Sequence, residues 1–199
     1  MTLANGFLAL VRKATADLDI DRLEDEVHAF ARRHPDWTTR RKADFLILRT
    51  ARRAAALGAV ASLPPGWAAL LAVAPELSAL LIMQSRLILS LHLLYGGVPE
   101  PEERALEVLA GLATGAGINV GRRLTTRAAE EIASRLVARL AGREASHFVP
   151  IAGAVAAAAL NYAAVRAVGR AAAYRVEKLY GPPELPGSGP VLDATGRVA

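Results

Sequence analysis

Two pairs of side chains have the spacing at which helices supply ligands to a metal ion. Asp25 and His28 lie three residues apart, and so do Glu144 and His147. Four-helix bundles that bind two iron ions use a carboxylate and a histidine at this spacing. Both pairs lie outside the apolar segments of the chain, however, and the second lies beside a predicted loop. We interpret the spacing as coincidental, and a metal-binding helical enzyme is the least favoured function.

Other residue patterns of enzyme active sites are missing from the sequence. The chain has no cysteine, which excludes disulfides, thiolate nucleophiles and Cys-ligated metal sites. It also lacks the Gly-x-Ser-x-Gly motif, the P-loop and the His-Glu-x-x-His motif. The glycine-rich stretch "GAGINVG" at 115–121 follows a predicted helix rather than a strand, which makes it a weak candidate for nucleotide binding. We predict no catalytic residue, no cofactor and no bound metal.

The composition favours helices throughout. Of the 199 residues, 53% are hydrophobic but only 5% are aromatic, and alanine is abundant. No segment has the two-residue period of a strand, and there is no internal repeat. The sequence therefore predicts an all-α fold, a compact bundle of about six helices with a central pair of apolar, Ala/Gly-rich helical hairpins.

Proline, glycine and acidic residues mark where the helices begin and end. One helix is expected within 19–35, and a second over about 38–62, up to the break at "LPPGW". The third, at about 67–95, contains Pro75, where we expect a kink or a new start, and ends at "YGG". Three more are expected from Pro101, over 123–140, and from Pro150 to about Tyr180. We divide the chain into an N-terminal helical segment (1–37), a helical domain (38–181) and a tail (182–199) with the composition of a disordered end.

Basic side chains are concentrated in one segment. Between positions 40 and 53, six basic residues and one acid give a local net charge of +5, equal to that of the whole chain. Basic residues beside an apolar segment are typical of a cytoplasmic membrane face, although the solvated side of a long helix has the same pattern. We expect no nucleic-acid binding, because the segment lacks interleaved aromatic residues and a recognisable binding module. The six basic residues are Arg40, Arg41, Lys42, Arg49, Arg52 and Arg53.

A second group of cations follows one face of the last predicted helix. Tyr162, Arg166, Arg170, Tyr174 and Lys178 recur every four residues. Guanidinium groups suit phosphate, and tyrosine suits the membrane interface, so Arg166 and Arg170 are candidates for binding lipid headgroups or a partner. The alternative is a partly exposed helix face whose cations pair with acids such as Glu177.

Two apolar stretches raise the question of whether the chain crosses a membrane. The stretch at 149–165 has no charge, but alanine dominates it and contributes little to insertion. The stretch at 67–94 is more hydrophobic but contains Glu76, Arg86 and His92, and a charge at mid-bilayer costs roughly 2.5–3.5 kcal/mol. We therefore predict buried hairpins rather than membrane spans, with peripheral or re-entrant membrane contact as an addition.

Three polar residues in these stretches are candidates for burial: Glu76, Gln84 and Asn161. Glu76 follows Pro75, and this pair suits the first turn of a helix better than it suits a proton carrier. Asn161 is expected to form a buried hydrogen bond that fixes helix register. Contact with a ligand is the more specific but rarer alternative.

The order of several short motifs resembles the EcsC family. The likeness covers about 54–180: an apolar hairpin before "YG", the helix start "PEPEER", and a late helix with the pattern P-x-x-G-A-x-x-x-x-x-x-N that ends in "GRAA". The "LPPGW" turn departs from the glycine-rich turn of that family. A YcjF-type helical domain, found beside GTPase modules, is the second resemblance. Membership of the EcsC family implies a bacterial accessory protein, often membrane-associated and linked by name to an ABC transporter system, with no catalytic residues to transfer.

Together these patterns predict a non-enzymatic accessory protein at the cytoplasmic side of the inner membrane. It would bind anionic lipid or a membrane-protein partner through the basic segment, Arg166 and Arg170. The N-terminus has no basic region or cleavage site of a signal peptide, so cytoplasmic exposure is expected. The alternative is a soluble helical module in the cytoplasm that forms homo-oligomers or docks on another protein.

Overall fold

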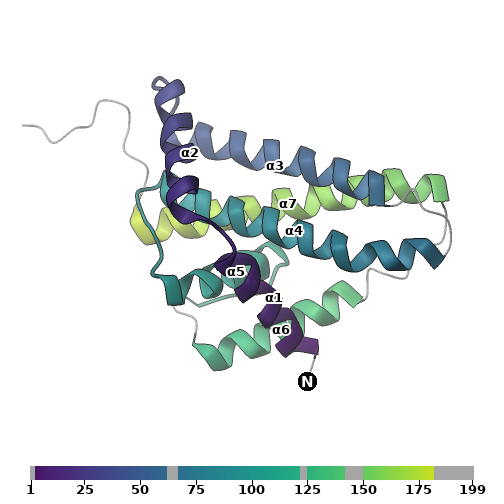
Figure 1. The fold of residues 1–199 in the computed structure, drawn as a ribbon. Coiled ribbons are helices and arrows are strands. Elements are labelled where there is room, and N and C mark those ends of the chain that lie inside the picture. The colour runs from purple at the N-terminus through teal and green to yellow at the C-terminus, as the bar shows by residue number, and fades with distance from the viewer. Residues whose placement is uncertain (1–2, 62–66, 122–124, 142–149, 182–199) are drawn as a thin grey trace, which may run out of the picture.

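Seven α-helices and no strand make up the part of the chain that the computed structural model describes, residues 3–61, 67–121, 125–141 and 150–181 (Figure 1). The all-α prediction is confirmed. The predicted tail at 182–199 lies outside the described residues. The helices are α1 (Leu3–Ala16), α2 (Ile20–Arg33), α3 (Thr39–Ala61), α4 (Trp67–Leu94), α5 (Pro101–Gly115), α6 (Thr126–Ala141) and α7 (Pro150–Tyr180).

Helix α4 lies at the centre of the bundle and packs against α1, α2, α3, α5 and α7. Its second half is largely apolar, and such a helix is stable only when other elements cover it. Leu87, Ile88, Leu89 and Leu91 are all buried there. The helix passes Pro75 without interruption, so no new helix starts at that residue.

Helices α3 and α7 form the most extensive helix pair, and they run antiparallel along one side of α4 (Figure 1). Small residues allow their close approach. A Cβ at Gly169 would lie 2.8 Å from a side-chain carbon of Ile47, and a Cβ at Gly58 would lie 3.0 Å from the carbonyl oxygen of Ala157. Helix α7 also packs against α5, so it ties the centre of the bundle to the helices on the other side.

The first helix, α1, was not among the six predicted from the sequence. Its first turn has no acid, and a glycine at position 6 weakens the helical signal. Leu8, Val11 and Ala14 nevertheless have helical spacing and are buried, mainly where α1 meets α6, α4 and α5. They belong to the same buried cluster as Leu23 of α2, so α1 and α2 share the core of the later helices.

Two glycines with positive φ end helices, and the sequence predicts the first of these ends, at "YGG". Gly96 has a φ of 79° after α4, and the N–H of Gly97 donates to the His92 carbonyl at 2.9 Å. Gly117 has a φ of 73° after α5, and the N–H of Ile118 donates to the Ala113 carbonyl at 2.8 Å. Both are Schellman caps, which need a residue in the left-handed region. The "GAGINVG" stretch therefore holds a helix cap, which accounts for its central glycine.

Candidate functional site

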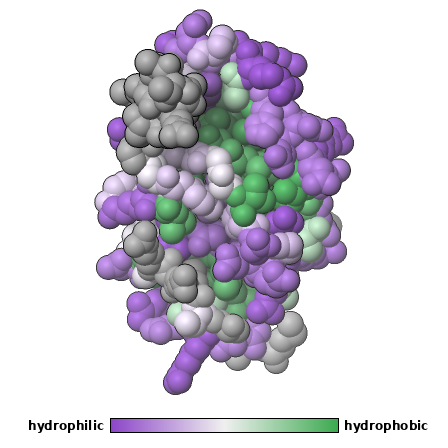
Figure 2. Space-filling view, turned by 90° about the vertical axis from the view of Figure 1, so that its left-hand side faces the viewer, coloured by the Kyte–Doolittle hydropathy of each residue, from purple (hydrophilic) through white to green (hydrophobic). Residues whose placement is uncertain are grey.

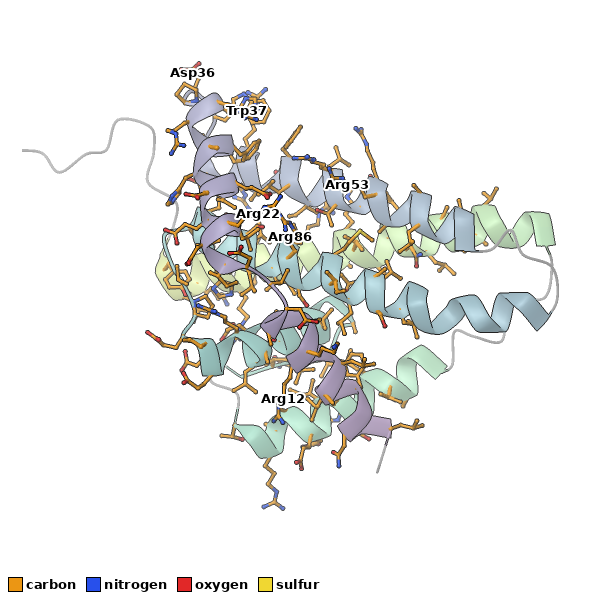
Figure 3. All side chains as sticks on the ribbon, in the orientation of Figure 1. Arg12, Arg22, Asp36, Trp37, Arg53 and Arg86 are labelled. Atoms are coloured by element: carbon orange, nitrogen blue, oxygen red, sulfur yellow. The ribbon has the colours of Figure 1, made fainter. Side chains whose placement is uncertain are left out.

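The basic segment predicted to bind lipid lies on α3, mostly on the side that faces away from the bundle. Ala43, Ile47, Ala51 and Ala54 are buried at helical spacing and turn one side of α3 to the core. Five exposed residues on the other side form what we call the outer α3 surface: Arg41, Phe45, Arg49, Arg52 and Arg53 (Arg53 is labelled in Figure 3). Of the other predicted residues, Arg40 is exposed near the start of α3 and Lys42 is half-buried.

The outer α3 surface carries four arginines, and the exposed Asp44 is the one acid between them in the sequence. Within the described ranges, no carboxylate lies within 4.0 Å of Arg41, Arg49, Arg52 or Arg53, whereas Arg22 and Arg86 both pair with Glu26 where α2 crosses α4 (Figure 3). Exposed cations that form no ion pair attract anions more strongly than cations that do. This surface therefore carries an excess of positive charge.

An aromatic cluster adjoins these cations at the corner between α2 and α3. The rings of Phe30 and Phe45 stack with centroids 5.4 Å apart, and those of His34 and Trp37 stack at 4.1 Å. The Arg41 guanidinium lies over Trp37, 4.6 Å from the ring centroid. Figure 3 places Trp37 at the tip of this corner. Phe45 is 39% exposed within the basic segment, so the prediction that this segment lacks interleaved aromatics is wrong at Phe45.

The second predicted stripe, on α7, is also turned outward. Arg166, Arg170, Tyr174 and Lys178 are exposed, and Tyr162 is half-buried. Arg166 lies over the ring of Tyr162 at 6.0 Å, and the ammonium of Lys178 lies 4.5 Å from the ring centroid of Tyr174. In the described part of the chain these three cations have no ion pair with an acid, Glu177 included. Two of the three cations, Arg166 and Lys178, thus contact a phenol ring of the stripe.

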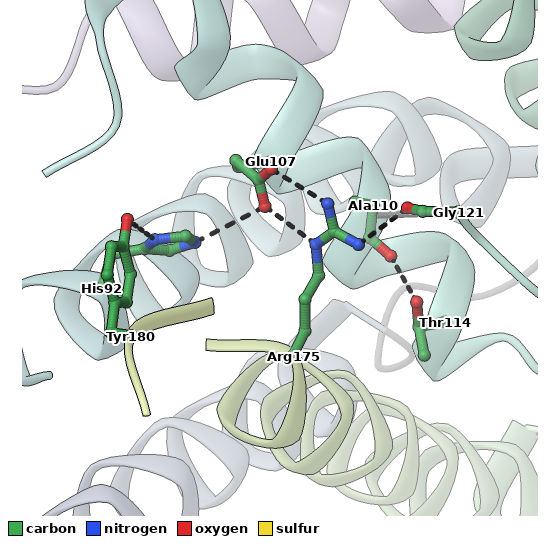
Figure 4. Close-up of polar contacts among 7 residues, drawn as sticks. All are labelled: His92, Glu107, Ala110, Thr114, Gly121, Arg175 and Tyr180. Atoms are coloured by element: carbon green, nitrogen blue, oxygen red, sulfur yellow. Dashed lines mark hydrogen bonds and ion pairs between the residues drawn. The ribbon is translucent and has the colours of Figure 1, made fainter. Parts of the chain in front are cut away.

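A polar network that the sequence did not indicate lies between α4, α5 and α7 (Figure 4). Glu107 accepts two hydrogen bonds from Arg175, at 2.9 and 3.0 Å, and Arg175 also donates to the Gly121 carbonyl at 3.1 Å. On the other side of Glu107 lies His92, whose Nε2 is 3.8 Å from Oε2. The Nδ1 of His92 is 3.2 Å from the Tyr180 hydroxyl. These contacts join residues from three helices and the link after α5.

Burial sets the charge state of this network. His92 is only 1% exposed, and this burial, with a smaller effect of the nearby Arg175, lowers the pKa of its imidazole to about 4 although Glu107 acts in the opposite direction. The imidazole is therefore neutral at pH 7, and the Glu107 charge is balanced by Arg175. Burial, followed by the charges of Glu107 and Glu103, raises the pKa of Tyr180. The groups satisfy one another, as expected for a connection between helices.

The three polar residues predicted to be buried have different positions. Asn161 is half-buried beside Gly58 of α3, where a Cβ on that glycine would overlap the Asn161 amide nitrogen. Gln84 is half-buried on α4, and the side chain of Glu76 lies outside the described residues. The fully buried polar residues of α4 are instead His92 and Ser85, and the Ser85 hydroxyl has no hydrogen-bond partner among the described residues.

The two Asp/Glu–His pairs considered for metal binding form no ligand cluster in the described part of the chain. Asp25 and His28 are exposed on α2, and Glu144 and His147 lie outside the described residues. Over the described ranges, no group of three or more His, Cys, Asp or Glu side chains is placed to hold a metal ion.

One helix of the described chain is long and apolar enough to cross a membrane. The window is Leu77–Leu94 of α4, and half of its residues are buried inside the bundle. A core helix of a bundle has the same length and composition, so this window alone does not indicate a membrane span.

Comparison with known proteins adds no relative: no family model, no curated protein and no solved structure matches this chain. The resemblance to the EcsC family stays a prediction from the sequence.

Proposed function

We propose that this protein is a non-enzymatic accessory protein that attaches peripherally to an anionic membrane surface through the outer α3 surface. The observation that carries the proposal is the set of four exposed arginines that form no ion pair in the described chain, directly beside an aromatic cluster. Such a role agrees with what the resemblance to the EcsC family implies.

The chemistry of this surface suits the interface of a membrane. Each arginine near an anionic leaflet contributes roughly 1 kcal/mol, so several on one helix face give useful affinity without any inserted helix. Tryptophan and phenylalanine at the edge of a cationic surface add apolar contact at the headgroup level. Arg41 and Trp37 already touch, and together they present a cation and a ring at the tip of the α2–α3 corner.

Exposed hydrophobic side chains favour a second candidate, a helical module that self-associates or docks on another protein. Val155 is 72% exposed on α7, and Leu160 is exposed five residues later. Figure 2 views the opposite end of the bundle, where hydrophobic residues gather in the middle and hydrophilic ones border them. Exposed apolar surface of this kind marks protein interfaces as well as membrane contacts.

Vesicle sedimentation with the full chain, purified without detergent, tests the proposal. We expect binding to vesicles that contain phosphatidylglycerol, loss of binding at high salt, and little binding to pure phosphatidylcholine. The triple variant Arg49→Ala/Arg52→Ala/Arg53→Ala should bind about a hundredfold more weakly, since three charges contribute roughly 3 kcal/mol.

A matched variant distinguishes an effect of the outer α3 surface from an effect of the net charge of the protein. Arg12→Ala/Arg127→Ala/Arg135→Ala removes three exposed arginines from α1 and α6 and should weaken binding about twofold at most. Equal losses in both triple variants, or equal binding to both lipids, would contradict the proposal. If the protein forms a monodisperse oligomer and does not bind vesicles, the result supports the interaction module. If it binds duplex DNA and does not bind vesicles, the surface is assigned to nucleic acid.

A further inference from the structure

A pocket of about 470 Å³ lies where the end of α5 and the link after it meet the last turns of α7. Sites for small ligands commonly have volumes of about 300–1,000 Å³. The pocket contains no residue of the outer α3 surface, so it is separate from the proposed membrane contact.

The pocket wall combines cationic, polar and apolar groups. Arg175 and Lys178 provide positive charge, and Asn119 provides an amide that can donate or accept hydrogen bonds. Val120 and Leu179, both half-buried, provide apolar surface, and the ring of Tyr174 provides an aromatic one. A wall with a few polar groups among apolar ones is typical of a site that orients an amphipathic molecule.

The two cations of the pocket wall each contact neighbouring groups. The Arg175 side chain is only 11% exposed and is held by Glu107 and the Gly121 carbonyl. The ammonium of Lys178 lies 4.5 Å from the ring centroid of Tyr174, and both residues line the pocket. Since Glu107 balances one of the two cations, the described residues that line the pocket keep one net positive charge, which matches a ligand with a single negative charge.

We infer that this pocket binds a small organic anion: one oxyanion group, a carboxylate or a phosphodiester, attached to an apolar body. The oxyanion lies at Lys178 and Asn119, and the apolar body covers Val120, Leu179 and the Tyr174 ring. A free organic acid and the headgroup region of a single phospholipid both have this chemistry.

Titration of the ¹⁵N-labelled full chain with sodium octanoate, followed by NMR, tests the inference. Saturable shifts are expected at the backbone amides of Asn119, Val120 and Lys178, with a dissociation constant on the order of 1 mM for a ligand of this size. Lys178→Glu should weaken binding about tenfold. Arg170→Glu, on the same outward face two turns earlier but outside the pocket, should change it less than twofold.

Two uncharged or truncated probes separate the parts of the inference. If 1-octanol binds as tightly as octanoate at the same amides, the oxyanion assignment is wrong. If acetate binds as tightly as octanoate, the apolar part is wrong. Shifts spread over other surfaces, or equal effects of the two charge reversals, would overturn the site as a whole.

A short-chain phosphatidylglycerol, used as monomers, identifies the source of the ligand. Tighter binding than octanoate at the same amides assigns the pocket to a phospholipid, and weaker binding assigns it to a free organic acid. The triple variant of the outer α3 surface should bind octanoate normally, so failure of the membrane proposal and failure of this inference give different results.

Discussion

Arg175 of α7 and Glu107 of α5 form an ion pair with two parallel hydrogen bonds, at 2.9 and 3.0 Å, although 68 positions separate them in the chain. The Arg175 and Glu107 side chains are only 11% and 18% exposed. Such a pair fixes the distance and the rotation of α5 relative to α7 because the guanidinium fork accepts only one orientation of the carboxylate. The pocket at the end of α7 depends on the same arginine.

Removal of the carboxylate should destabilise the fold strongly. Glu107→Gln leaves the Arg175 charge without its partner in a largely buried position, and we expect a loss of about 3 kcal/mol in the free energy of unfolding. Denaturation by urea measures this loss. The control is Glu131→Gln, which removes an exposed pair with Arg135 on α6 and should change stability by about 0.5 kcal/mol at most. Similar losses in both variants would contradict the role of the Glu107–Arg175 pair.

The stability of the protein should fall as the pH drops from 6.5 towards 4. In the unfolded chain His92 takes up a proton near pH 6.5, but in the fold its pKa is about 4, so the unfolded state binds more protons between these values. The expected loss across this window is about 3 kcal/mol. The ion pair of Glu26 with Arg86 lowers the pKa of Glu26 below 4.5, so its contribution is lost only at lower pH.

Urea denaturation at several pH values between 7 and 4.5 measures this dependence. His92→Gln should flatten it, whereas His28→Gln, which removes an exposed histidine of α2, should leave it unchanged. A direct NMR titration gives the pKa of His92, and a value near 6.5 would show that the imidazole is not desolvated as described.

The sequence is sufficient to predict the helices after α1 and much of the exposed surface. Helix ends are encoded locally, which is why "YGG" after α4 and Pro101 at the start of α5 predict them correctly. The exposed stripe on α7 follows from four-residue spacing alone. The helix α1 was missed because its first turn lacks an acid, although the spacing of Leu8 and Val11 was a usable signal.

The buried network could not be predicted in the same way. His92, Glu107 and Arg175 lie on three helices, and their contacts depend on how those helices pack rather than on any spacing within one of them. The aromatic cluster could be predicted only in part. Its residues can be read from the sequence, but Phe30 and Phe45 stack only because the chain folds back at the corner between α2 and α3. A histidine in the apolar stretch of α4 was the one sequence signal for the network.

The end of α7 should depend on the absence of a side chain at Gly97. A Cβ there would overlap the Tyr180 ring, which also lies edge-on against His92 with centroids 5.8 Å apart. Gly97→Ala should therefore destabilise the protein by about 1–3 kcal/mol, the usual cost of overpacking.

A double-mutant cycle checks this contact. Gly97→Ala should cost much less in a Tyr180→Ala background, because the ring that it meets is gone. Tyr174→Ala, which removes an exposed ring of the same helix, should not relieve it. Additive losses in the cycle with Tyr180 would mean that the ring does not lie against Gly97.

The contact between α5 and α7 should be equally sensitive at Gly115. A Cβ at this position would lie 2.5 Å from the Val168 Cα and 2.8 Å from its backbone nitrogen, and backbone atoms in a helix cannot move aside as a flexible side chain can. We expect Gly115→Ala to lower the free energy of unfolding by about 2 kcal/mol.

Gly6 of α1 is the matched control, since a Cβ there would have no atom within 4 Å. Gly6→Ala should stabilise the protein by up to about 1 kcal/mol through its helix propensity. Thermal and urea denaturation of both variants measure whether each change lowers or raises the free energy of unfolding. A stabilising effect of Gly115→Ala would show that α5 and α7 do not approach this closely.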